Sequence, residues 1–177
     1  MAVDLMVVPH QAGTTKASVR AARWAPHEKL TARIASGLEP ALVAHAVVII
    51  AALEPDDGRS ADLRVAGPAA LLAVEAIKIS ERLERADTQP DRLREKDALD
   101  AFRILQAVDT AGLVEGFASH GVDHYAAAVT AEALEVYRTD SSTAEGRIAQ
   151  LAAAAAHGDP TVAPSFAALV RELLNAL

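Results

Sequence analysis

Two aspartates at the start of a predicted helix have the type and spacing needed for chemistry. The stretch REKDALDAFRIL, residues 94–105, opens with charged side chains, carries Asp97 and Asp100, and then turns apolar. Acidic side chains favour helix N-termini because the helix dipole is positive there, and Asp caps helices well. This interpretation makes the pair a cap with contacts to Lys96 and Arg103. The alternative is that Asp97 is a catalytic acid at the mouth of a helix.

A second charged pair lies in the predicted helix GPAALLAVEAIKISERLER, residues 67–85. Glu75 falls on or beside the apolar stripe of this helix, where a carboxylate without a partner is costly. Lys78 follows three residues later and is its natural partner. The pattern therefore predicts a salt bridge at the edge of the core.

Other types of site are less well supported. HGVDH, residues 120–124, offers two histidines and an aspartate, which are metal-ligand types, but no third ligand or supporting residue is identified. The absence of cysteine excludes disulfides, thiolate metal sites and a cysteine nucleophile. No Gly-rich phosphate loop and no serine in a nucleophile elbow are present.

Composition predicts a soluble cytoplasmic protein whose core is built from small aliphatic side chains. Of the 177 residues, 51% are hydrophobic but only 3% are aromatic, so alanine, leucine and valine must fill the core. No basic-then-apolar signal opens the chain, and the most apolar run, residues 41–53, is too short to span a bilayer. The net charge is −7, yet residues 1–53 carry five basic and three acidic side chains. This basic third either meets a polyanion or is a solvated helix face.

Periodicity predicts an α+β fold in which a small, short-stranded sheet precedes a C-terminal helical bundle. Residues 1–66 form the sheet region and residues 67–177 the helical region, packed together as one unit. Residues 16–38 have helical character, interrupted at Pro26, and a capping box is expected at 142–145. Strands are expected at 3–8, 44–53 and 61–66, and helices at 68–86, 95–109, 122–138, 142–157 and 163–176.

Three motifs in order carry a resemblance to a known family. They are VDLMV at residues 3–7, RVAGPAALLAVEAIKISER at 64–82, and REKDALDAFRILQAVD at 94–109. This series resembles the AbiEii-type nucleotidyltransferases, the abortive-infection and MenT-like toxin family, over roughly residues 3–110. The resemblance implies a small mixed sheet of the nucleotidyltransferase type. It also implies Mg²⁺-dependent transfer of a nucleoside monophosphate from an NTP to an acceptor such as tRNA, and a cognate antitoxin as a further partner.

The resemblance also implies roles for individual residues. Asp4 is the strand carboxylate that binds Mg²⁺, and Asp97 is the acid at the helix start. The position of the family lysine is held by Glu75, and Lys78, one turn further along the helix, is expected to take over its catalytic role, with Arg20 or Arg23 near the nucleotide phosphates.

Departures from the family pattern support two further hypotheses. The family's first strand carboxylate falls at Ala2, its lysine falls on Glu75, and its Gly-Ser segment would lie before Met1. The second hypothesis is therefore a catalytically degenerate or shortened relative that acts as a binding or regulatory module or has no activity. The third is a purely helical interaction protein in which the order of the three motifs is coincidental. A first strand near a sheet edge also predicts a homodimer.

Overall fold

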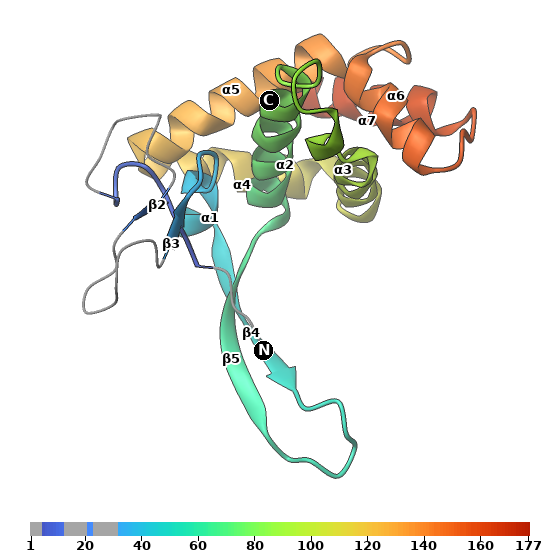
Figure 1. Cartoon of the computed structure of the whole chain (residues 1–177). Coiled ribbons are helices and arrows are strands. Elements are labelled where there is room, and N and C mark those ends of the chain that lie inside the picture. The colour runs from blue at the N-terminus through green and yellow to red at the C-terminus, as the bar shows by residue number, and fades with distance from the viewer. Residues whose placement is uncertain (1–4, 13–20, 23–31) are drawn as a thin grey trace.

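The structure, a computed structural model, describes residues 5–12, 21–22 and 32–177. These residues form a helical body, a small sheet beside it, and a long β-hairpin that projects away from it (Figure 1). The α+β fold class predicted from the sequence is confirmed. None of the helices among the described residues has both the length and the apolar composition needed to cross a bilayer.

The helical body holds most of the described chain. Two of its helices begin at aspartate caps: Asp109 Oδ1 accepts a hydrogen bond from the Gly112 amide, and Asp123 Oδ1 accepts from the amides of Tyr125 and Ala126. The α-helices are α1 (Glu39–Val43), α2 (Pro68–Leu83), α3 (Glu95–Ala107), α4 (Thr110–Ser119), α5 (His124–Asp140), α6 (Arg147–Ala155) and α7 (Val162–Ala176).

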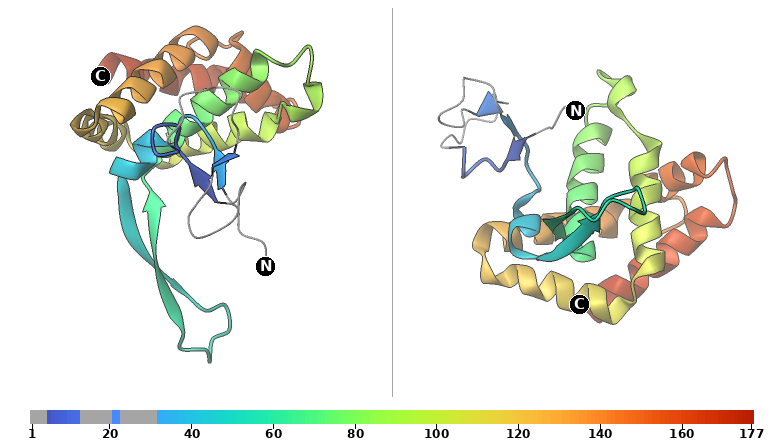
Figure 2. Two further views of the ribbon diagram at one scale, coloured as in Figure 1. Left: turned by 60° about the vertical axis from the view of Figure 1, so that its left-hand side comes forward. Right: turned by 90° about the horizontal axis from the view of Figure 1, so that it is seen from below.

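Helix α2 lies at the centre of the body, with α3, α4 and α5 packed around it (Figure 2). Its buried face is built from four alanines together with Leu72, Ile77 and Ile79. Small side chains let the helices approach closely: a Cβ on Gly116 of α4 would lie only 2.7 Å from the Ala69 Cβ. The Tyr137 hydroxyl of α5 donates a hydrogen bond to the Leu72 carbonyl at 3.0 Å. Packing and one buried hydrogen bond thus fix α2 from several sides.

The small sheet consists of β1 (Met6–Val7), β2 (Ala21–Ala22) and β3 (Ala32–Ile34), in the order β1-β3-β2. Strand β3 is parallel to β1 and antiparallel to β2. The helix predicted within residues 16–38 is therefore wrong for the described residues 21–22 and 32–34. Helical propensity is a weak prior, and pairing with neighbouring strands overrides it here.

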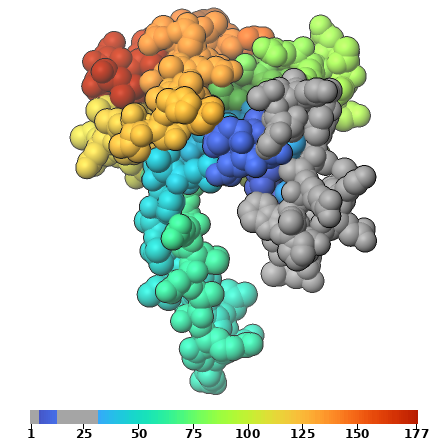
Figure 3. All heavy atoms as spheres, turned by 90° about the vertical axis from the view of Figure 1, so that its left-hand side faces the viewer, coloured from blue at the N-terminus to red at the C-terminus, as the bar shows by residue number. Residues whose placement is uncertain are grey.

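The hairpin is formed by β4 (His45–Ala51) and β5 (Ser60–Ala66), which pair antiparallel along their whole length. Both strands were predicted from the sequence, but they were expected to belong to the same sheet as the first strand. In the part of the chain described, they pair with no strand of the small sheet. Figure 3 shows the hairpin extending well beyond the helical body. The single mixed sheet expected from the sequence is thus two separate sheets.

The helix boundaries show where local patterns mislead. The predicted capping box at 142–145 is wrong, because α6 begins at Arg147 and has no side-chain cap at Gly146. Helix α4 was not predicted, since the predicted helices end at residue 109 and resume at residue 122. It follows α3 after a break at Val108 and Asp109, where both residues have extended backbones.

Phe166 should contribute strongly to stability because it is fully buried between Phe102 and Tyr137, with ring centroids 5.6 and 6.4 Å away. We expect Phe166→Ala to lower the free energy of unfolding by about 3–5 kcal/mol, measured by urea denaturation. The neighbouring exposed Ser165 provides the control, and Ser165→Ala should stay within about 0.5 kcal/mol of the wild type. Equal effects of the two substitutions would contradict this packing.

Candidate functional site

Four charged side chains meet between α2 and α3, and we call them the α2–α3 charge cluster: Glu75, Lys78 and Arg82 of α2 with Asp97 of α3. The Lys78 ammonium lies 2.6 Å from each Glu75 carboxylate oxygen and donates a hydrogen bond to Oε1. It also lies 3.2 Å from Asp97 Oδ1. The Arg82 guanidinium donates to Asp97 Oδ2. The Asp97 carboxylate therefore bridges two cations of the neighbouring helix.

The spacing on α2 explains why its three members meet. Residues 75, 78 and 82 are separated by three and four positions, so their side chains project from one face of the helix. Asp97 lies in the first turn of α3, where its carboxylate faces the end of α2. The cluster therefore joins the last turns of one helix to the first turn of the next.

Asp97 does not cap its helix, contrary to the simpler of the two interpretations. The N-cap of α3 is Arg94, and no side chain there accepts a hydrogen bond from the first-turn amides. Asp100 behaves differently, since its carboxylate pairs with Lys96 and Arg103 at the surface. The expected contacts to Lys96 and Arg103 are thus right for Asp100 and wrong for Asp97.

The carboxyl of Glu75 has a raised pKa because it is largely buried. The side chain is only 17% exposed, and loss of solvent raises the pKa of this carboxyl above its ordinary value. The hydrogen bond and charge of Lys78 act in the opposite direction, while the negative charges of Asp97 and Asp100 add to the rise. The predicted Glu75–Lys78 salt bridge is therefore present, but burial outweighs it in setting the pKa of Glu75.

The structure brings together two of the residues expected at the site, Lys78 and Asp97. Asp4, Arg20 and Arg23 lie outside the described residues, so their roles stay predictions. Arg82 had no role assigned from the sequence. Its spacing of four from Lys78 was the available signal, but its contact with Asp97 depends on how α3 lies against α2.

The four side chains of the α2–α3 charge cluster do not fit a magnesium ion. Both oxygens of Asp97 face the cations Lys78 and Arg82, which would repel a third cation. Among the described residues, no group of three or more His, Cys, Asp or Glu side chains could hold a metal ion. The cluster is better suited to an anion, whose oxygens could take the place of the Glu75 carboxylate on Lys78 and bind Arg82 beside Asp97.

The histidines of HGVDH have separate environments. His120 is fully buried, its Nδ1 lies 2.7 Å from Thr130 Oγ1, and burial lowers the pKa of its imidazole. His124 opens α5, and its ring lies against Tyr125 with centroids 3.8 Å apart. His120 is thus part of the packing between α5 and the turn before it.

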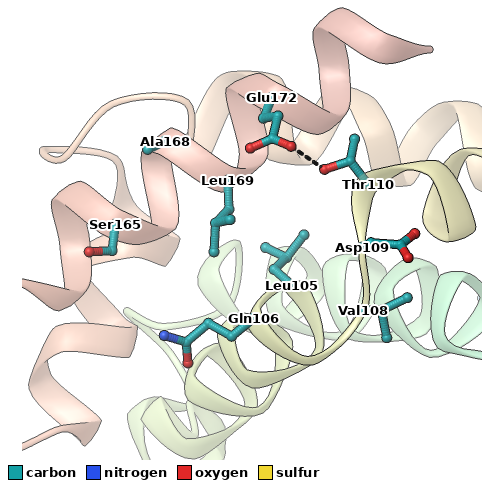
Figure 4. A pocket seen from close by; sticks show the side chains of 9 residues that line it. All are labelled: Leu105, Gln106, Val108, Asp109, Thr110, Ser165, Ala168, Leu169 and Glu172. Atoms are coloured by element: carbon teal, nitrogen blue, oxygen red, sulfur yellow. Dashed lines mark hydrogen bonds between the residues drawn. The ribbon is translucent and has the colours of Figure 1, made fainter.

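A pocket of about 680 Å³ lies elsewhere, between the α3–α4 junction and α7 (Figure 4). The charged side chains that line it are the carboxylates of Asp109 and Glu172, and Glu172 accepts a 2.5 Å hydrogen bond from the Thr110 hydroxyl. Because its charged groups are negative, this pocket is poorly suited to a triphosphate. No member of the α2–α3 charge cluster lines it.

Asp97 and Asp100 lie on one helix and allow the contribution of partly buried ion pairs to stability to be compared with that of exposed ones. We expect Asp97→Asn to destabilise the protein by about 1.5–3 kcal/mol, because it leaves Lys78 and Arg82 half-buried without their shared partner. Asp100→Asn should cost less than about 1 kcal/mol, because its ion pairs are exposed. Urea unfolding of both variants measures the difference, and equal losses would show that the cluster adds nothing beyond a surface ion pair.

The raised pKa of Glu75 predicts a pH effect of defined sign. The folded protein holds this proton more tightly than the unfolded chain, whose carboxyl titrates near 4.5. Glu75 therefore makes stability fall as the pH rises from that value through the raised pKa. The melting temperature of Glu75→Gln minus that of the wild type should become more positive over this range. Glu81→Gln, on the exposed side of α2, is the control, and parallel curves for all three proteins would contradict the prediction.

No protein-family model, curated protein or solved structure matches this chain. The function of the α2–α3 charge cluster is therefore inferred from its own geometry and from the motifs that contribute to it.

Proposed function

We propose that this chain is a nucleotidyltransferase-fold protein of the AbiEii type, which binds an NTP at the α2–α3 charge cluster and transfers its nucleoside monophosphate to an acceptor such as tRNA. The observation that supports this proposal is the meeting of Lys78, Arg82 and Asp97 in one half-buried cluster. Lys78 and Asp97 come from two different motifs of the resemblance, and the fold places them in contact.

The two cations suit a polyphosphate. Lys78 and Arg82 are 32% and 26% exposed, so both can be reached from solvent while remaining partly shielded from it. Partial burial strengthens their attraction for phosphate oxygens, and a guanidinium can bind two such oxygens at once. Bound there, the phosphates would be held in place by side chains of one rigid helix.

The proposed transfer is an in-line displacement. An acceptor hydroxyl gives up its proton to solvent water, its oxygen forms a bond to the α-phosphorus of the NTP, and the bond from that phosphorus to pyrophosphate breaks. Lys78 and Arg82 stabilise the negative charge on the phosphate oxygens. Asp97 keeps the two cations in position. The roles of Asp4 in binding Mg²⁺, and of Arg20 and Arg23 near the phosphates, rest on the resemblance alone.

One observation favours the alternative, a degenerate relative that acts as a binding or regulatory module. Glu75 occupies the position of the family lysine and holds the Lys78 ammonium at 2.6 Å. Two carboxylates and two cations make the cluster neutral, so an NTP must displace an existing partner. Glu75 would then remain half-buried beside a triphosphate, and the two would repel each other.

Thermal unfolding with each of the four NTPs, with and without Mg²⁺, tests binding. A ligand at a hundredfold excess over its Kd should stabilise the chain by about 2.7 kcal/mol, or roughly 5–11 °C in melting temperature. Lys78→Ala should lose this shift because it removes a phosphate contact. Lys96→Ala, which removes an exposed lysine of α3, should retain it. The absence of a shift with every NTP would reject the binding site.

Two further measurements separate transfer from binding alone. Glu75→Lys should strengthen NTP binding because it replaces the repelling carboxylate with a cation, and weaker or unchanged binding would reject the placement of residue 75. Incubation of the wild type with total tRNA and an NTP labelled at the α-phosphate should label the RNA. Binding without any label on the RNA would support the binding module instead.

A further inference from the structure

The β4–β5 hairpin exposes an unusual amount of apolar surface. Every residue of β4 is exposed, as is every residue of β5 except Ala66. Val47 and Ile49 are 62% and 69% exposed, and Leu63 is 49% exposed. An isolated two-stranded hairpin is marginally stable in water, and contiguous exposed apolar surface usually marks an interaction site. The helical body does not cover this surface (Figures 1 and 3).

Pairing across the hairpin separates its side chains into two faces of different character. Register pairs such as Val48 with Leu63 and Ile49 with Asp62 define which residues share a face. One face is entirely apolar and consists of Ala46, Val48, Ile50, Ala61, Leu63 and Val65. The other carries the charged side chains of β5, with Asp62 opposite Ile49 and Arg64 opposite Val47. Neither charged side chain therefore has a partner of the other charge directly across from it on β4.

Strand β5 also presents a free edge. In the described residues it pairs only with β4, so its outer backbone groups are available to another strand. Its seven residues make a longer edge than β1, which has two. The hairpin projects away from the body, so a partner strand can approach without meeting the helices (Figure 1).

We propose that the partner is a second copy of this chain, whose β5 pairs antiparallel with β5 of the first around a twofold axis at Leu63. The two hairpins then form one four-stranded antiparallel sheet. In this register Asp62 lies opposite Arg64 of the partner subunit, and Arg64 lies opposite Asp62 of the partner subunit. Twofold symmetry thus turns one strand with two unlike charges into two ion pairs.

The charges select this register over its neighbours. An axis at Asp62 or at Arg64 would place two like charges opposite each other. A shift by one residue would set the charged face of one hairpin beside the apolar face of the other. The β4 edge offers no such selection, because Val47 to Ile50 are all aliphatic. Complementary charges on β5 therefore identify both the partner and the alignment, independently of the proposed function.

Sedimentation of the full-length chain and of charge variants tests the dimer. The wild type should be dimeric at micromolar concentrations. Asp62→Arg and Arg64→Asp should each be monomeric, with a dissociation constant raised roughly tenfold or more, because each places like charges across the twofold axis. An equimolar mixture of the two variants should form a heterodimer, because both cross-strand pairs then have opposite charges.

The control is Asp87→Arg, which changes the net charge as Asp62→Arg does but lies in an exposed loop outside the hairpin, and it should remain dimeric. Both β5 positions are exposed, so circular dichroism of the variants should match that of the wild type. A monomeric wild type would overturn the proposal. So would single variants that stay dimeric, or a mixture that fails to associate, because each excludes the Leu63-centred pairing.

Discussion

The burial of α2 at the centre of the helical body is the constraint on which the other features depend. Alanines along this helix allow α3, α4 and α5 to approach closely, and the contact between Gly116 and Ala69 leaves no room for a larger side chain. With few aromatic side chains available, close approach of backbones supplies the packing density that large rings supply elsewhere. A helix fixed from several sides then presents its remaining face in a defined position.

The α2–α3 charge cluster is the result of that fixed position. Glu75 sits at the margin of the buried face, so loss of solvent raises its pKa even though Lys78 is in contact with it. Asp97 and Asp100 have the same chemistry and lie three residues apart, yet their surroundings differ. Asp97 faces α2 and holds two of its cations, whereas Asp100 faces solvent and pairs with neighbours on its own helix. Orientation on α3 therefore decides which carboxylate belongs to the candidate site.

The hairpin differs from the helical body in where its apolar side chains lie. The body buries its apolar residues internally, while the hairpin exposes them. At the base of the hairpin, the hydrogen bond from the Gly67 amide to the Ala44 carbonyl continues the pairing of its two arms. A two-stranded ribbon has no interior of its own. A strand paired along its edge would therefore add stability that the ribbon lacks by itself, and the charges on that edge indicate which strand can pair there.

The sequence by itself determined the features that depend on neighbours along the chain. Periodicity placed α2, α3, α5, α6 and α7 and both strands of the hairpin, and three-residue spacing predicted the Glu75–Lys78 salt bridge. Tertiary structure alone decided that residues 32–34 are a strand, that β4 and β5 stand apart from the small sheet, and that Asp97 meets Arg82. Local patterns encode contacts within a turn of helix or across a short hairpin. Contacts between distant segments depend on how whole elements pack, and that packing is a property of the complete core.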